Sequence, residues 1–104
     1  MKYDVIIIGA GPGGIFSAYE LTKHNGNLKI AIFEAGHALE KRHCPIDGKK
    51  ITSCIHCKSC SIMSGFGGAG AFSDGKYNIT NDFGGTLYEY VGKEKAIQLM
   101  HYVD

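Results

Sequence analysis

The sequence lacks the features that direct a chain to a membrane, to nucleic acid or into the secretory pathway. Its formal net charge is only +1 at pH 7, so no field of one sign attracts nucleic acid or an anionic lipid surface. The apolar run Val5–Ala10 is far too short to span a bilayer. Residues 1–4 do not follow the plan of a signal peptide, and no repeat or low-complexity tract occurs. We therefore expect a cytoplasmic protein with no membrane partner and no nucleic-acid partner.

A glycine turn between a strand and a helix is the first motif of the chain. The run Asp4–Ile8 is rich in β-branched residues, which is typical of a buried parallel strand. A helical pattern of apolar residues extends from Ile15 to Lys23, directly after a Gly-x-Gly-x-x-Gly sequence. Strand, glycine turn and helix in this order predict a dinucleotide-binding fold, with a pyrophosphate on the N-terminus of the helix. The residues expected at the pyrophosphate are Gly9, Gly11, Pro12, Gly13 and Gly14.

Glu34 completes this motif. A second apolar run, Leu28–Phe33, ends in Glu34, which lies 20 residues beyond Gly14. An acidic side chain at this distance is expected to accept hydrogen bonds from the adenosine ribose, and it argues against a 2′-phosphate. Residues 1–34 therefore predict the N-terminal β-α-β unit of a doubly wound, Rossmann-like α/β domain. The alternative is a glycine turn that binds no ligand.

The chain is short for a whole domain of this class. A doubly wound domain needs about five or six parallel strands, and only two are clear in these 104 residues. Residues 77–80 favour β structure and residues 81–85 a turn, while a helical face that starts at Lys93 has no stop signal. We expect an incomplete domain that belongs to a longer protein.

Four cysteines lie close together within residues 43–60. Their spacing is Cys44-x9-Cys54-x2-Cys57-x2-Cys60. Four thiolates could close a tetrahedral zinc site or hold an iron–sulfur cluster, although the C-x3-C-P ending of the bacterial ferredoxin run is missing. Residues 41–60 carry five Lys or Arg against one Asp, and positive surroundings favour thiolates. A metal or cluster site, redox-active thiols and four reduced structural cysteines all remain open.

Glycine makes up 15 of the 104 residues, about twice the usual share of roughly 7%, and seven of these glycines fall between Ser61 and Gly85, five of them in the segment of residues 64–76. Two phenylalanines in this segment argue against a flexible linker. Small residues let the backbone approach a flat ligand and offer N–H donors, so we expect a cofactor-binding loop. Its candidate contacts are Gly67, Gly68, Ala69, Gly70, Ser73, Asp74 and Lys76. Arg42 is a candidate for contact with adenine or pyrophosphate, and a solvated arginine is the alternative.

The glycine turn with Glu34 resembles the FAD-binding start of the glutathione-reductase-like flavoproteins. The combination of His43-Cys44-Pro45, the triplet of cysteines and residues 65–76 is similar to a narrower group, a widespread family of bacterial and archaeal FAD-dependent dehydrogenases. The resemblance implies an FAD-dependent oxidoreductase of several hundred residues, whose later part closes the sheet and adds a substrate domain.

The implied partners are FAD and a small-molecule or redox-protein electron donor or acceptor, such as NAD(P)H. No residue of this chain is a convincing acid, base or nucleophile, so no catalytic residue is assigned. A nucleotide-binding piece without catalysis, and an electron-transfer module with metal on the cysteines, are the alternatives.

Overall fold

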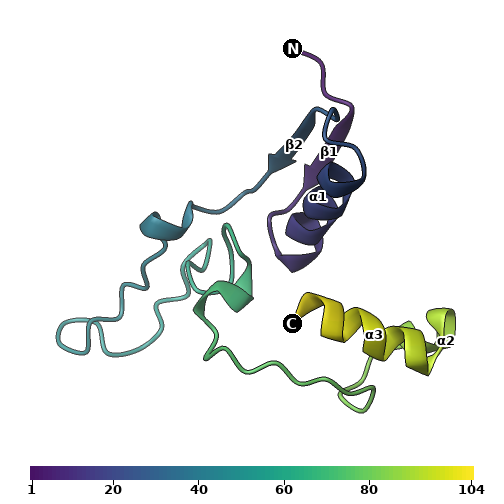
Figure 1. Cartoon of the computed structure of the whole chain (residues 1–104). Helices are drawn as coiled ribbons and strands as arrows, with labels where there is room; N and C mark the ends of the chain where they lie inside the picture. Colours follow the sequence, from purple (N-terminus) through teal and green to yellow (C-terminus); the bar gives the residue numbers. More distant parts are fainter. The chain divides into compact units, whose positions relative to one another are not determined.

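The computed structural model describes all residues, Met1–Asp104, and divides into two compact units, residues 1–73 and residues 74–104 (Figure 1). The first unit begins with strand β1 (Val5–Ile8), helix α1 (Pro12–His24) and strand β2 (Ile30–Phe33). The two strands pair in parallel, in a register that places Val5 beside Ile30 and Ile8 beside Phe33. The predicted β-α-β order is present as a two-stranded parallel sheet with its connecting helix.

Helix α1 begins three residues earlier than its apolar periodicity predicts. Pro12 is its first residue, a position that suits proline because φ is already helical and no N–H is needed there. Close packing of this first turn requires glycine, since a Cβ on Gly14 would overlap the Gly9 carbonyl oxygen and lie 3.2 Å from Ile7 Cγ2. The helix ends with Lys23 and His24 in its last turn, where cations are favoured by the helix dipole.

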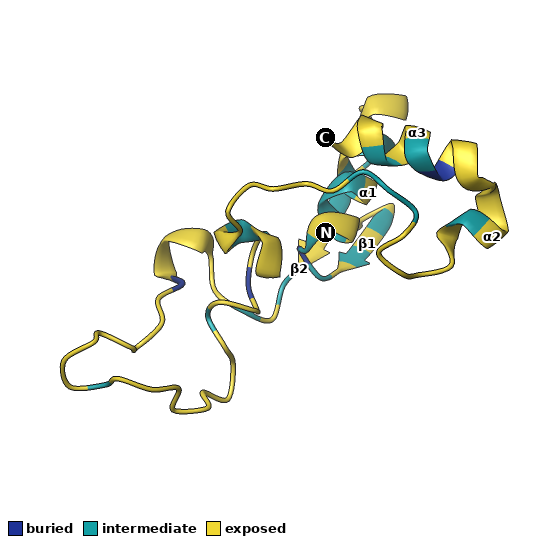
Figure 2. Cartoon of the chain, turned by 90° about the horizontal axis from the view of Figure 1, so that it is seen from below, coloured by how far each residue is buried: buried dark blue, intermediate teal, exposed yellow.

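One face of the small sheet has no cover within this unit. The register places Ile6, Ile8 and Phe33 on the face opposite to Ile7, and their side chains are 59%, 89% and 57% exposed. Parallel strands are normally covered on both faces, which is why these runs are so apolar. The only buried apolar residues of the chain are Ala10 and Ala96, and exposed positions dominate both units in Figure 2.

Beyond β2 the first unit is mostly irregular. It contains two short 3-10 helices, η1 (Leu39–Lys41) and η2 (Ala69–Phe72), which flank the segment with the cysteines. Residues 61–68 return to lie beside residues 36–42, as shown by a hydrogen bond from the Phe66 N–H to the His37 carbonyl oxygen at 3.0 Å.

The second unit consists of an extended segment followed by helices α2 (Leu87–Val91) and α3 (Lys93–Val103). The helix expected from Lys93 is confirmed, and so is the turn over residues 81–85. The β-favouring residues 77–80 form no strand, because no neighbouring strand is present to take their backbone hydrogen bonds. Helix α2 was not predicted; it has only five residues and no side-chain cap. None of the helices is long and apolar enough to cross a membrane.

A candidate nucleotide site at the glycine turn

The glycine turn presents an uncapped helix N-terminus with open space before it. Gly9 has a φ of +100°, and its N–H donates to the Phe33 carbonyl oxygen at 2.7 Å, which fixes the turn at the end of β1. No side chain caps α1, and no acidic residue lies in its first turn. A Cβ added at Gly11 would meet nothing within 4 Å. The first N–H groups of α1, at Gly13 and Gly14, are therefore free to receive an anion.

Glu34 is held against this turn by both of its carboxylate oxygens. Oε2 accepts the Ala10 N–H at 2.8 Å, and Oε1 accepts the Gly36 N–H at 2.8 Å. These two bonds, with a smaller contribution from the Arg42 charge, hold the pKa of Glu34 below its usual value. The carboxylate is thus ionised and oriented, and each oxygen keeps lone pairs that can accept from hydroxyl groups.

The glycine-rich loop packs directly on the glycine turn, although the two are far apart in sequence. The Gly67 N–H donates to the Ala10 carbonyl oxygen at 2.8 Å. A Cβ added at Gly68 would lie 3.2 Å from Gly11 Cα and 3.3 Å from Pro12 Cδ, so the two backbones are in close contact. The structure therefore brings the glycine turn, Glu34 and residues 67–68 together. Ala69 and Gly70 follow as the start of η2.

Arg42 lies inside the protein and is held by backbone carbonyl groups. Its side chain is only 3% exposed, so it is not a solvated arginine. Its Nε donates to the Ser61 carbonyl oxygen at 2.8 Å and its Nη2 to that of Ile62 at 2.7 Å, while Nη1 donates to those of Phe66 at 2.8 Å and Gly68 at 2.9 Å.

At least four of the five N–H donors of Arg42 are therefore used within the protein, and the guanidinium also lies 4.8 Å from the centre of the Phe72 ring. This arrangement gives Arg42 a structural role, and its expected contact with adenine or pyrophosphate stays a prediction. This role could not be predicted from the sequence, because the acceptors are backbone carbonyls, which every residue carries.

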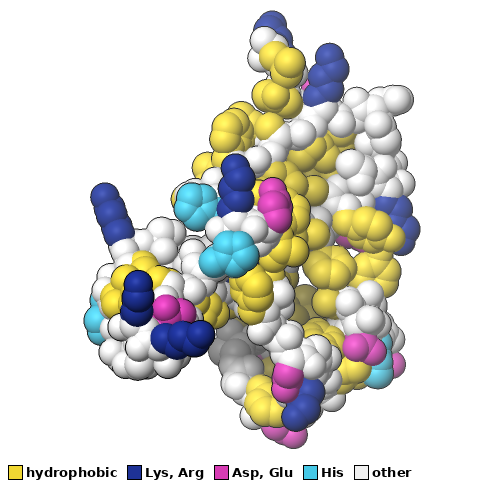
Figure 3. Space-filling model, turned by 90° about the vertical axis from the view of Figure 1, so that its left-hand side faces the viewer, with side chains coloured by type: hydrophobic (Ala, Val, Ile, Leu, Met, Phe, Trp, Pro, Cys, Tyr) yellow, Lys and Arg dark blue, Asp and Glu magenta, His cyan; other side chains and the backbone are white.

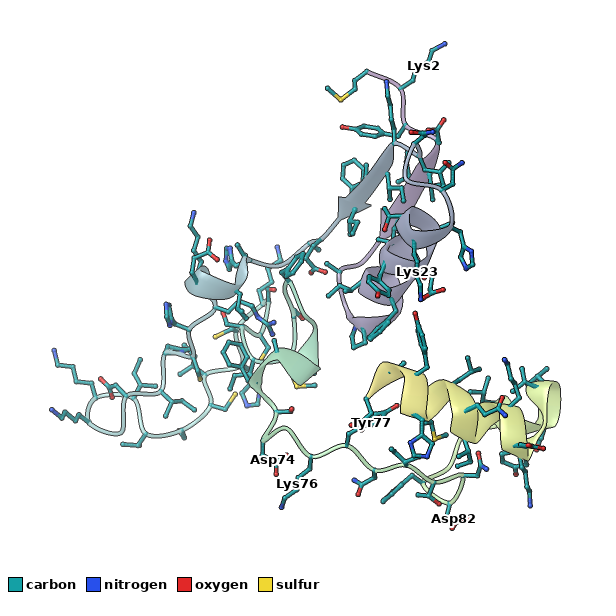
Figure 4. All side chains as sticks on the ribbon, in the orientation of Figure 1. Lys2, Lys23, Asp74, Lys76, Tyr77 and Asp82 are labelled. Atoms are coloured by element: carbon teal, nitrogen blue, oxygen red, sulfur yellow. The ribbon has the colours of Figure 1, made fainter.

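The remaining side chains of the glycine-rich segment fall at the boundary between the units. Ser73 ends the first unit, whereas Asp74 and Lys76 belong to the second. The two charged groups pair with each other, with 3.6 Å between Lys76 Nζ and Asp74 Oδ2, and the Lys76 N–H donates to Asp74 Oδ1 at 3.1 Å. Figure 4 labels both on the extended segment that follows η2. Their contact with a cofactor stays a prediction.

The four cysteines line one cavity but do not form a metal site. No disulfide joins the four cysteines, all of which are exposed, and they border a space of about 160 Å³. No three His, Cys, Asp or Glu side chains are grouped so that they could hold a metal ion. The ligand set expected for zinc or an iron–sulfur cluster, Cys44, Cys54, Cys57 and Cys60, is therefore not formed. Regular spacing along an open loop does not by itself bring four sulfurs to the roughly 2.3 Å from one point that zinc requires.

Comparisons with known proteins give partial matches. A sequence model of the Thi4 family matches residues 1–40, the part that contains the glycine turn and Glu34. An uncharacterised protein of Clostridium beijerinckii is 35% identical over 76 residues, which are 73% of this chain and 14% of that protein. The thiamine thiazole synthase of Yarrowia lipolytica is 60% identical over 35 residues, which are 34% of this chain and 11% of that enzyme.

The thiamine thiazole synthase of Candida albicans is 56% identical over 32 residues, which are 31% of this chain and 9% of that enzyme. The chain thus spans only a small part of the length of the curated relatives it matches. No solved structure matches it. The β-α-β unit is therefore similar in sequence to the Thi4 family and to two thiamine thiazole synthases, over about a third of the chain.

Proposed function

We propose that the first unit binds the ADP part of FAD and that the protein is an FAD-dependent oxidoreductase. The observation that supports this most strongly is the position of Ala10 between two other segments. Its N–H donates to Glu34 Oε2, and its carbonyl oxygen accepts the Gly67 N–H, both at 2.8 Å. Three segments with the sequence characters of a pyrophosphate turn, a ribose acceptor and a flavin loop therefore meet at one fully buried residue.

The residues of this site suit the charges of a dinucleotide. The positive end of the α1 dipole and the N–H groups of Gly13 and Gly14 would hold the pyrophosphate, and Gly11 leaves room for its approach. The Glu34 carboxylate would accept from the ribose hydroxyls while its two backbone bonds keep it in place. The isoalloxazine supplies the redox chemistry when FAD is bound, and the protein binds and orients it. The electron partner would be a small molecule such as NAD(P)H, or a redox protein.

A second candidate is activity of the kind named by the matched relatives, thiamine thiazole synthase. The observation in its favour is the Thi4 match. That match stops at residue 40, so it includes neither the cysteines nor the glycine-rich loop, whereas the similarity to the Clostridium beijerinckii protein extends over 76 residues. We place the oxidoreductase first because its expected site also uses the glycine-rich loop, which donates the Gly67 N–H to the Ala10 carbonyl oxygen.

One pair of experiments tests the proposed function. The full-length natural protein, purified and supplied with FAD, should hold flavin in a one-to-one ratio and should lose the yellow flavin absorbance when NAD(P)H or another donor is added without oxygen. A flavin-free protein that takes up no added FAD would contradict the proposal. In parallel, the same gene is expressed in a strain that lacks its thiamine thiazole synthase. Growth without thiamine would favour the second candidate.

A further inference from the structure

Arg42 connects the cysteine-lined cavity to the glycine turn. Two of its hydrogen bonds go to the carbonyl oxygens of Ser61 and Ile62, and both of these residues line the cavity. Its other two go to the carbonyl oxygens of Phe66 and Gly68, in the loop that lies on the glycine turn. We refer to Arg42 with these four carbonyl acceptors as the Arg42 clamp. Because a guanidinium is planar and rigid, the clamp holds the cavity wall at residues 61–62 in a fixed position relative to the loop at residues 66–68.

Two of the cysteines flank the clamp in sequence and share its cavity. Cys44 lies two residues after Arg42, and Cys60 directly precedes Ser61. Both line the same cavity, and both are exposed and outside any disulfide. The Cys60 carbonyl oxygen also accepts the N–H groups of Met63 at 3.1 Å and Ser64 at 2.8 Å, so a displacement of Cys60 would shift the start of this turn.

The surroundings of these thiols suit a small anionic disulfide such as oxidised glutathione. Lys49, Lys50 and Lys58 belong to the same segment, with Asp47 as its single carboxylate. Figure 3 presents the side where this segment lies in Figure 1, and Lys and Arg side chains appear there with Asp and Glu side chains among them. A positive local field attracts an anionic reagent to the thiols.

We propose that Cys44 and Cys60 form a redox site, and that joining them in a disulfide opens the Arg42 clamp and weakens nucleotide binding. The oxidant is a low-molecular-weight disulfide. One thiolate attacks it, which forms a mixed disulfide and releases one small thiol; the second cysteine then displaces the other small thiol. One disulfide bond is broken in the reagent and one is formed in the protein, and the two cysteine protons leave with the two small thiols.

The geometry explains why this bond would affect the clamp. A disulfide fixes the two Cβ atoms about 3.5–4.5 Å apart, so forming it would tie the position of Cys60 to that of Cys44 across the cavity that both line. Cys60 would then move the carbonyl groups of Ser61 and Ile62, which must stay within about 3.2 Å of the guanidinium nitrogens to remain hydrogen-bonded. Loss of those bonds frees Arg42 to shift, and with it the loop that donates the Gly67 N–H to Ala10. The effect on affinity rests on the proposed nucleotide site.

The test uses the full-length natural protein treated with oxidised glutathione and then with a reducing agent. Three proteins are compared: the wild type, the double variant C54S/C57S, which keeps the proposed pair, and the matched double variant C44S/C60S, which removes it. Peptide mass spectrometry identifies the disulfide, NMR hydrogen exchange follows the Gly67 N–H, and fluorescence titration gives the FAD affinity.

In the wild type and in C54S/C57S, oxidation should produce the Cys44–Cys60 disulfide, speed exchange at Gly67 and raise the Kd for FAD by about fivefold or more, reversibly. C44S/C60S should show neither change. The proposal is overturned if this disulfide does not form in excess oxidised glutathione, or if it forms with unchanged exchange at Gly67. If the reduced protein binds no FAD, the proposed function fails, but exchange at Gly67 still decides the coupling.

Discussion

Ala10 and Glu34 are joined by a hydrogen bond of 2.8 Å from the Ala10 N–H to Glu34 Oε2, across 24 residues of sequence. Ala10 is fully buried, so this bond lies at the centre of the glycine turn. It makes the turn and the acidic residue one unit: the end of β2 positions the carboxylate, and the carboxylate fixes the turn. The two halves of the predicted dinucleotide motif therefore depend on each other for their geometry.

Replacing Glu34 by Gln should weaken FAD binding by about tenfold, because a neutral acceptor makes weaker hydrogen bonds to the ribose hydroxyls than a carboxylate does. The amide NH₂ would also face one of the two N–H groups, of Ala10 or Gly36, that the carboxylate now accepts. Fluorescence titration of the full-length variant measures the change. An unchanged affinity would leave Glu34 with a structural role only.

The Glu34 carboxylate should also make the folding stability of the protein depend on pH. The hydrogen bonds from Ala10 and Gly36 hold the pKa of Glu34 below its usual value of 4.5, and those from Ile51, Lys49 and Lys50 hold that of Asp47 below 3.8. The stability that each contributes is complete above its unfolded-state pKa and is lost as the pH falls through its folded-state pKa. The melting temperature of the full-length protein should therefore decrease as the pH is lowered below about 5. The decrease should be less steep in E34Q and in D47N. Equal pH slopes in all three proteins would contradict this.

The β-α-β unit could be predicted from the sequence because its determinants are local. The apolar runs, the glycines of the turn and the distance to Glu34 are properties of adjacent residues, and the clash that a Cβ at Gly14 would make with the Gly9 carbonyl oxygen shows why glycine is needed at that position. Helix α1 was predicted to start later than it does because the prediction used apolar periodicity, to which Pro12 and Gly13 do not contribute.

The contacts that depend on distant backbone groups could not be predicted from the sequence. The four acceptors of Arg42 are main-chain carbonyls 19 to 26 residues away, so nothing in the side-chain pattern marks them. The cysteine spacing correctly suggested that the four thiols share one place, but whether they converge on one point depends on the path of a loop with little regular structure.

Replacing Arg42 by Lys should loosen the loop of residues 61–68. Lysine keeps the charge but lacks the planar group that reaches four carbonyls, so some of these part-buried acceptors lose their hydrogen bonds, at about 0.5–1.5 kcal/mol each. Faster hydrogen exchange in residues 61–68 and a lower melting temperature of the full-length protein are expected. Lys41→Ala is the matched control, since Lys41 is the exposed neighbour. Equal effects of the two changes would refute the role of the clamp.

The 104-residue chain, expressed alone, should aggregate. Its two-stranded sheet leaves Ile6, Ile8 and Phe33 largely exposed on one face, and an isolated pair of strands is marginally stable. Light scattering should fall when Ile8 and Phe33 are both changed to Thr, which keeps β-branched residues or β propensity on that face. A monomeric wild-type chain with a sharp cooperative melt would show that this face needs no cover.

The central claim, that the glycine turn holds the pyrophosphate of FAD, is tested most directly by an FAD titration of the Gly11→Val variant of the full-length protein. A Cβ at this position meets no protein atom within 4 Å, so the substitution acts mainly on the space a ligand would fill. Gly26→Ala, in the turn after α1, is the matched control, because a Cβ there would make only an ordinary contact of 3.8 Å with the Thr22 carbonyl oxygen. The account predicts that Gly11→Val loses FAD while its melting temperature without ligand stays that of the wild type, and that Gly26→Ala binds normally. Wild-type FAD affinity in Gly11→Val would contradict it.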